Sequence, residues 1–120
     1  MIIPENYVCT PLNEEGLIEC DLAILEESVN IKRFNLSNED ALYLLDNYFD
    51  FVNVECDAII MEQEDEIIPY EKLEVGIEIT KILLDNNDDE RFQYLVSNIL
   101  DIFETAFKLK TYVRVTLYGL

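Results

Sequence analysis

The chain has 120 residues and a formal charge of −18, because 26 Asp and Glu residues outnumber eight Lys and Arg residues and there is no His. Half of the residues are apolar, which predicts a single folded domain and excludes an acidic disordered tail. The scarcity of Lys and Arg argues against direct binding to nucleic acid or to an anionic membrane, and the absence of His excludes most hydrolase and metalloenzyme sites.

The N-terminal part of the chain predicts a β-hairpin. Apolar residues alternate with polar ones from Leu17 to Leu25, and more loosely from Val29 to Phe34. No basic region precedes an apolar stretch at the N-terminus, so we expect a cytoplasmic protein without a secretion signal.

The middle of the chain predicts a helix, a short strand and a loop. Ser37 followed by Asp40 is an N-cap arrangement, because the Ser hydroxyl can accept from a first-turn amide and the acid favours the helix N-terminus. A helix should therefore run from about Asn38 to Phe51. Residues 58–62 form a short apolar run that could be a strand, and residues 62–66 should be a solvated loop.

The C-terminal half predicts two helices and a final strand. Pro69 suits the first turn of a helix, and residues 72–80 fit a strand by their alternation or a helix by their narrow polar arc. The apolar residues that follow favour the helix. Residues 88–90 place negative charge at the start of a five-turn amphipathic helix, and residues 111–120 alternate like a terminal strand buried on one face. The apolar face of the long helix consists of Phe92, Leu95, Val96, Ile99, Leu100, Ile102, Phe103, Ala106 and Phe107.

No repeat, low-complexity tract or Gly/Ser linker divides the chain. The order of elements is strands, helix, short strand, two helices and strand. It predicts one acidic α+β domain over residues 1–120, with about three helices packed on one side of a small, mostly antiparallel sheet.

The sequence contains no recognisable motif for catalysis, a cofactor or a metal. Nucleophile-elbow, P-loop and dinucleotide-binding patterns are absent, and no carboxylate pair can be singled out among 26 acids. Residues 85–90 lack the Gly and the spaced final Glu of a calcium-binding EF-hand, so we interpret them as a turn between helices. Cys9, Cys20 and Cys56 lack the spacing of a disulfide framework or a zinc site, and we expect buried, reduced thiols. We expect no enzyme, no cofactor and no bound metal.

The charge surplus points instead to a basic protein partner. On the predicted helix, three acids and one Tyr recur at intervals of four, three and four residues, which places like charges and an aromatic ring on one face. The alternative is an ordinary solvated face of a very acidic protein. The loop at residues 62–66 and a Tyr on the polar arc of the long helix add further candidates. These candidate partner-binding residues are Glu39, Tyr43, Asp46, Asp50, Glu62, Glu64, Asp65, Glu66 and Tyr94.

A small, acidic, His-free α+β chain without a catalytic motif resembles the bacterial immunity proteins of contact-dependent inhibition and polymorphic toxin systems. Residues 38–42, Asn-Glu-Asp-Ala-Leu, are similar to the Asn-Leu-Asp-Ala-Leu helix start of barstar, and residues 103–106 end a helix before a final strand, much as in that family. This resemblance implies that Asp40 contacts a toxin. The next contacting Asp of that family falls on Leu44, and its preceding Tyr falls on Phe34. Only the strategy of an acidic helix that blocks a basic active site is therefore carried over.

The sequence thus predicts an immunity protein that binds and neutralises a cognate bacterial toxin domain, with a nuclease as the favoured target, by electrostatic and steric occlusion. Two alternatives stay open. One is a DNA-mimic inhibitor of the anti-restriction or anti-CRISPR type, which would present two rows of carboxylates spaced like phosphates. The other is an acidic adaptor subunit that docks on a basic surface of a larger assembly.

Overall fold

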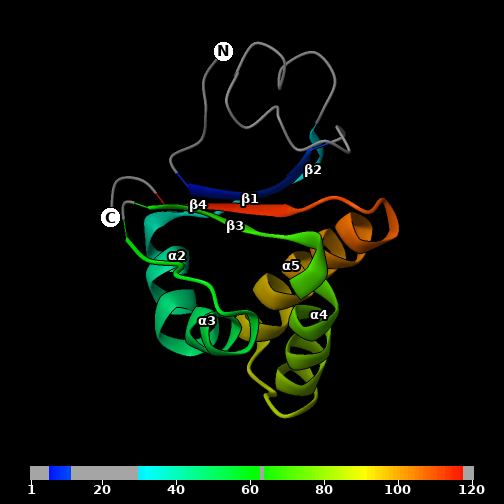
Figure 1. The fold of residues 1–120 in the computed structure, drawn as a ribbon. Helices are drawn as coiled ribbons and strands as arrows, with labels where there is room; N and C mark the ends of the chain where they lie inside the picture. Colours follow the sequence, from blue (N-terminus) through cyan, green and yellow to red (C-terminus); the bar gives the residue numbers. More distant parts are fainter. Residues whose placement is uncertain (1–5, 12–29, 63, 118–120) are drawn as a thin grey trace.

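The structure, a computed structural model, describes residues 6–11, 30–62 and 64–117. They form an α+β domain in which helices cover one side of a four-stranded antiparallel sheet with the strand order β2-β1-β4-β3 (Figure 1). This confirms the predicted fold class. The strands are β1 (Asn6–Pro11), β2 (Asn30–Asn35), β3 (Asp65–Ile68) and β4 (Val113–Leu117). The helical elements are α2 (Asn38–Leu44), the π-helical segment η2 (Leu45–Phe49), α3 (Asp50–Cys56), α4 (Tyr70–Asp85) and α5 (Glu90–Lys108).

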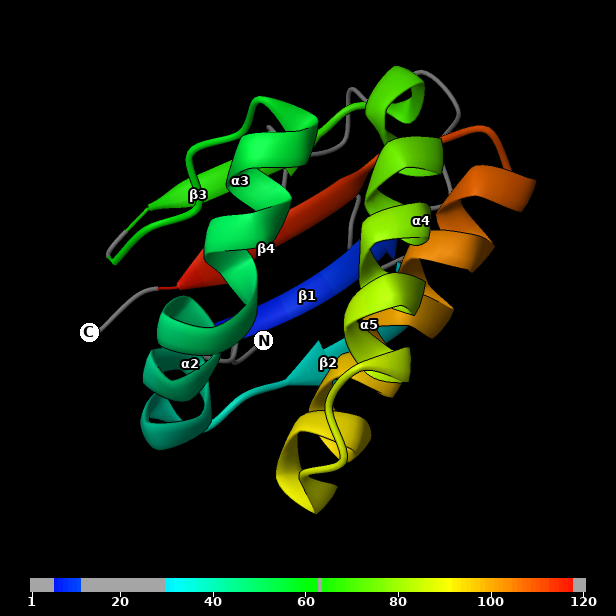
Figure 2. The same cartoon turned by 90° about the horizontal axis from the view of Figure 1, so that it is seen from below.

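Strand β1 is central, because it pairs with β2 on one side and with β4 on the other (Figure 2). The sequence did not predict it, since its six residues show no extended alternation and its partner β4 lies at the other end of the chain. The predicted strand at residues 29–34 corresponds to β2, but its antiparallel partner is β1. The other predicted hairpin strand, residues 17–25, lies outside the described residues.

The first helix begins as predicted and continues past its predicted end. The Ser37 Oγ accepts from the Asp40 N–H at 3.1 Å, which confirms the N-cap. The helical path then runs through η2 to Cys56 and ends at Asp57, whose left-handed backbone (φ 54°) closes the last turn. Two consecutive residues of η2, Tyr48 and Phe49, are fully buried.

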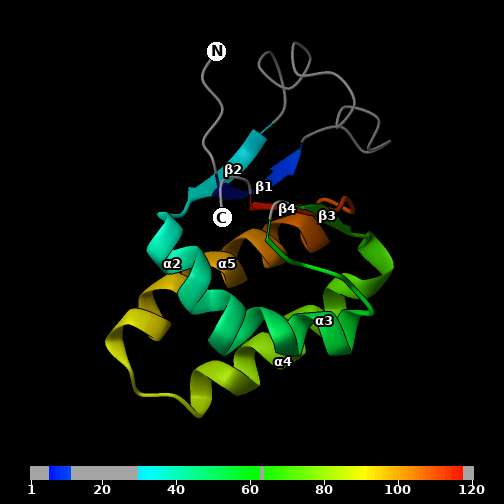
Figure 3. The ribbon, with the colours of Figure 1, turned by 90° about the vertical axis from the view of Figure 1, so that its left-hand side faces the viewer.

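Helices α4 and α5 pack against each other, and α5 also packs against strands β1, β2 and β4. Figure 3 shows α5 nearer the sheet than α4. Residues 72–80 are helical, as the sequence favoured. Pro69 precedes α4 as its N-cap instead of lying in the first turn. The Asp89 carboxylate caps α5 by accepting from the Phe92 N–H at 3.0 Å, and the predicted apolar face of α5 is buried or partly buried. Among the described residues, no helix combines the length and the apolar character needed to cross a membrane.

The predicted strand at residues 58–62 is wrong. That run is irregular, and β3 begins only at Asp65, inside the segment predicted as a loop. The physical reason is that the side chain of Asn53 binds the backbone of Ile60 on both its N–H and its C=O, so this apolar run needs no neighbouring strand. Ile68, at the end of β3, enters the core instead.

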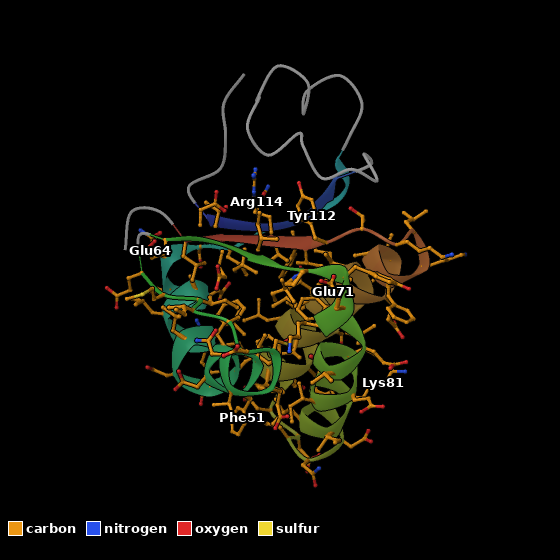
Figure 4. All side chains as sticks on the ribbon, in the orientation of Figure 1. Phe51, Glu64, Glu71, Lys81, Tyr112 and Arg114 are labelled. Carbon is orange, nitrogen blue, oxygen red and sulfur yellow. The ribbon has the colours of Figure 1, made fainter. Side chains whose placement is uncertain are left out.

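Strand β4 is buried on both faces, where the sequence predicted burial on one. It lies between β1 and β3, and all five of its residues are buried. Arg114, only 5% exposed, projects from the side of the sheet opposite the helices (Figure 4) and lies 3.5 Å from the Asp65 carboxylate. The Thr116 hydroxyl donates to the same carboxylate at 3.0 Å. The alternating polar residues of β4 therefore face a polar, buried layer and not open solvent.

The helices approach closely at Gly76 of α4. A Cβ atom there would lie 2.8 Å from the Phe103 ring and 3.2 Å from the Cys56 sulfur. A buried hydrogen-bond chain crosses the same region, in which the Tyr48 hydroxyl donates to Thr80 Oγ1 at 2.8 Å and Thr80 donates to the Gly76 carbonyl at 2.7 Å. Close contact and hydrogen bonding together join the first helix to α4 and α5.

We predict that Gly76→Ala lowers the free energy of unfolding. Ala is intrinsically better than Gly in a helix by about 0.8–1 kcal/mol, but forcing a methyl group into a packed core costs about 1–3 kcal/mol. Urea denaturation should show a net loss of stability. The matched change Glu74→Ala, at an exposed position of the same helix, should alter stability little. A Gly76→Ala variant more stable than the native protein would contradict the close approach.

Candidate functional site

The charge of the chain is distributed unevenly. From Phe34 to Glu71 there are eleven acids and no Lys or Arg, a stretch that we call the acidic segment. It covers the whole first helix, the loop after it and β3. Its acids are Glu39, Asp40, Asp46, Asp50, Glu55, Asp57, Glu62, Glu64, Asp65, Glu66 and Glu71. Negative potential is therefore concentrated on one continuous part of the fold.

A hollow of about 620 Å³ opens in the acidic segment, between the first helix and the loop that follows α3. It joins two acidic sets that the sequence analysis treated separately, the helical stripe and the loop at residues 62–66. Half of its lining residues are acids and half are apolar. The residues that line it are Leu45, Asp46, Asp50, Ile60, Met61 and Glu62.

The loop wall of the hollow is held in place by side-chain hydrogen bonds. Asn53 Nδ2 donates to the Ile60 carbonyl at 3.1 Å, and Asn53 Oδ1 accepts from the Ile60 N–H at 2.8 Å. At the preceding residue, the Ile59 N–H donates to the Glu66 carboxylate at 2.5 Å. These contacts bury Ile60 in the core and leave its neighbour Met61 half exposed at the hollow. The wall is thus preorganised, and sequence reasoning missed Asn53 because its role depends on a partner in the loop.

The three carboxylates of the hollow are exposed. Within the part of the chain that the structure describes, no Lys or Arg forms an ion pair with Asp46, Asp50 or Glu62. Asp46 and Asp50 lie one turn apart on the same helix, where like charges cost about 0.2–0.5 kcal/mol. A cation supplied from outside would relieve this repulsion.

The N-terminal end of the predicted stripe is already engaged within the molecule. Arg91 Nε and Nη2 donate to Asp40 Oδ1 at 3.0 and 2.7 Å, and its guanidinium lies 4.4 Å from the centre of the Tyr43 ring. The Tyr43 hydroxyl donates to Asp89 Oδ2 at 2.8 Å. A partner would therefore meet Asp40 and Tyr43 as members of an internal cluster, in contrast to the acids of the hollow.

Two pKa values in this cluster are shifted in opposite directions, each with its own main cause. The hydrogen bond from Tyr43 is the main cause that lowers the pKa of the Asp89 carboxyl, and the Phe92 N–H adds to it. Burial is the main cause that raises the pKa of the Tyr43 phenol, and Asp89 adds to it. Both shifts favour a neutral Tyr donor and an ionised Asp acceptor over the neutral pH range.

The remaining predicted residues do not gather at the hollow. Asp65 and Glu66 bind Arg114 and the loop backbone respectively, so they stabilise the fold. Glu39 and Glu64 are exposed. Tyr94, 65% exposed on α5, contacts the ring of Phe34 edge-on with 6.1 Å between the ring centres. The ten candidates therefore fall into several separate groups.

Among the described residues, a cysteine thiol or a group of acids could also be a site of chemistry. Cys56 is buried without a disulfide, as expected, and burial raises the pKa of its thiol to about 11. The Cys9 side chain and Cys20 lie outside the part of the chain that the structure describes. Over that same part, no group of three or more Cys, Asp and Glu side chains is arranged to hold a metal ion.

We predict that Asn53→Ala loosens the wall of the hollow. The substitution leaves the buried N–H and C=O of Ile60 without their partner, so the free energy of unfolding should fall by about 1–3 kcal/mol. Urea denaturation measures this loss, and hydrogen exchange should show reduced protection of the Ile60 amide. Asn47→Ala is the matched control, since among the described residues the exposed Asn47 side chain donates to the Tyr43 carbonyl of its own helix and not to the loop. Unchanged Ile60 protection in Asn53→Ala would contradict the assigned role.

We also predict that Tyr43→Phe raises the pKa of Asp89, because it removes the hydroxyl donor and keeps the ring. Asp89 has a lowered pKa when folded, so its contribution to stability is present above its unfolded pKa and is lost as the pH falls through its folded pKa. The stability difference between the native protein and Tyr43→Phe should therefore shrink in strong acid. NMR titration of the Asp89 carboxyl carbon measures the pKa directly, with Tyr94→Phe as the control. An unchanged Asp89 pKa would rule out the hydrogen bond.

Comparison with known proteins finds no family model, no curated protein and no solved structure that matches this chain. The case for a function therefore comes from the residues and their geometry. Its central feature is the acidic segment, with a hollow whose carboxylates lack an internal cation among the described residues.

Proposed function

We propose that this chain is a cytoplasmic immunity protein that binds and neutralises a basic toxin domain, with a nuclease as the favoured target. It catalyses nothing and acts by covering the toxin. The observation that carries the proposal is the acidic segment, with eleven acids and no base over 38 consecutive residues, numbers 34 to 71. Nuclease active sites attract phosphate and are therefore basic, which makes them complementary to such a surface.

Exposed apolar side chains in the acidic segment support a protein partner. Six of the ten large apolar side chains that are exposed in the described part of the chain lie in this segment. Val54 and Ile59 are 79% and 67% exposed, so they contribute little to the core of the monomer. They are Leu42, Phe51, Val54, Ile59, Met61 and Tyr70. Interfaces combine such apolar contacts with a charged surround, and a surface kept only for solubility has no need of them.

The same mixture favours a protein partner over the DNA-mimic alternative. A mimic of phosphate rows needs carboxylates in regular succession. Here Leu42 stands four residues before Asp46 and Val54 four residues after Asp50, so an apolar side chain stands on either side of this pair of acids and the row does not continue. The adaptor alternative would use the same surface, and the identity of the partner separates it from immunity.

In this proposal, charge and apolar contact have different roles. The acids speed the encounter with a basic toxin, and salt weakens that effect by screening. The exposed apolar side chains then slow dissociation, because they are removed from water in the complex.

We predict that co-expression of this chain protects cells from the toxin domain encoded by the adjacent gene. The association rate constant with that purified domain should fall at least about tenfold between low and high salt. Stopped-flow mixing at two salt concentrations measures it. A chain that gives no protection, or an association rate that salt leaves unchanged, would contradict the proposal.

A pair of matched double variants tests the surface. Val54→Ser with Ile59→Ser should raise the dissociation rate constant about tenfold, in line with the loss of about 1.4 kcal/mol of apolar contact. Val75→Ser with Ile82→Ser removes similar exposed side chains from α4, outside the acidic segment, and should change it less than about twofold. Equal effects of the two pairs would show that the acidic segment is not the contact surface.

A further inference from the structure

We infer that the hollow is a socket for one arginine side chain of the basic partner, an inference that rests on the proposed function. Its lining has an apolar part and an anionic part, and a long basic side chain has the same two parts in its stem and its head. Leu45, Ile60 and Met61 supply the apolar part. The carboxylates come from two separate elements, with Asp46 and Asp50 on the helix and Glu62 on the loop.

Charge complementarity identifies the occupant as a cation from outside the chain. The acidic segment contains no Lys or Arg, and the hollow's carboxylates have no ion-pair partner in the described part of the chain. A bare metal ion fits less well, because no group of three potential ligands converges among the described residues and half of the lining is apolar. A side chain that carries its charge on an aliphatic stem suits both halves of the lining.

Arginine suits the arrangement better than lysine. The guanidinium presents several donors in a fixed plane and is weakly hydrated, so it can bind carboxylates on different elements while lying on an apolar surface. A lysine ammonium is a compact, strongly hydrated point charge that gains less from the apolar part. Because Asn53 holds the loop wall in place, little ordering is needed when the side chain enters.

The protein itself contains an example of this interaction at the other end of the same helix. Arg91 donates twice to Asp40 and lies over the Tyr43 ring, so a guanidinium already binds there between a carboxylate and a flat carbon surface. The start of the acidic helix is thus served by an internal arginine. Asp46 and Asp50 lie further along the helix, and in this inference the guanidinium that binds them comes from the partner.

The test uses the full chain and three peptides that differ at one central residue, Ala-Ala-X-Ala-Ala with blocked ends, where X is Arg, Lys or the neutral isostere citrulline. Titrations followed by NMR should show the Arg peptide shifting the amide signals of Asp46, Asp50, Met61 and Glu62. Its affinity should exceed that of the citrulline peptide by about tenfold, since charge-assisted hydrogen bonds are roughly twice as strong as neutral ones, and should also exceed that of the Lys peptide.

The variants make the assignment specific to the hollow. Asp46→Asn with Asp50→Asn keeps the shape and should weaken Arg-peptide binding about tenfold. Glu74→Gln with Glu78→Gln removes the same charge from exposed positions on α4 and should weaken it less than about twofold. Equal losses in the two pairs, shifts spread over the whole acidic surface, or equal binding of the three peptides would overturn the inference.

The inference and the proposed function fail in different ways. If the native chain fails to protect cells, the proposed immunity function is rejected. This outcome is measured without any peptide. A chain that protects cells but whose hollow does not respond to the Arg peptide would keep its proposed function and lose the arginine socket. Calcium ions that shift the same amide signals at lower concentration than the Arg peptide would also reject the socket in favour of a metal site.

Discussion

Repulsion among carboxylates is the main physical constraint that this fold has to overcome. With a net charge of −18, folding brings like charges together, and the buried face of α5 must outweigh that cost. Side chains such as Phe92, Ile99 and Phe103 bury α5 in the core, and Gly76 lets α4 approach the Phe103 ring closely. Three described ion pairs each join two elements: Arg91–Asp40 joins α5 to α2, Lys81–Glu104 joins α4 to α5, and Arg114–Asp65 joins β4 to β3. These three cations are thus placed at junctions between elements of the fold.

This placement explains which acids of the described residues are left without an internal cation. Cations at the junctions neutralise acids at the start of the first helix and at β3, and none is contributed by the acidic segment itself. Between those two ends, Asp46, Asp50 and Glu62 surround the hollow. Because the cations of these ion pairs lie elsewhere, the hollow keeps its negative charge and is a concave, partly apolar surface. Some acids of this segment therefore stabilise the fold, and others are those that we propose for recognition of a partner.

The hollow also depends on hydrogen bonds that replace regular structure. Residues 58–62 have the apolar character of a strand, yet Asn53 satisfies the backbone of Ile60 and Glu66 accepts from the Ile59 N–H. The run therefore packs on α3 without joining the sheet, and the next polar residues form the edge strand β3. Charged side chains on an edge strand also discourage pairing with other chains. One amide side chain thus decides where the loop ends, where β3 begins and how the hollow is shaped.

The sequence alone determined the features that arise from short-range patterns. The Ser37 cap, the negative start of α5, its apolar face and the α+β class follow from residues a few positions apart, and local periodicity reports them directly. It also indicated a basic partner through charge, and it marked the acids that line the hollow. Tertiary structure decided what depends on distant neighbours. It made β1 and β4 central strands, engaged Tyr43 and Asp40 with Arg91, and brought Glu62 to Asp46 and Asp50. These outcomes depend on which surfaces meet after the chain folds back, and a pattern along the sequence carries no record of that.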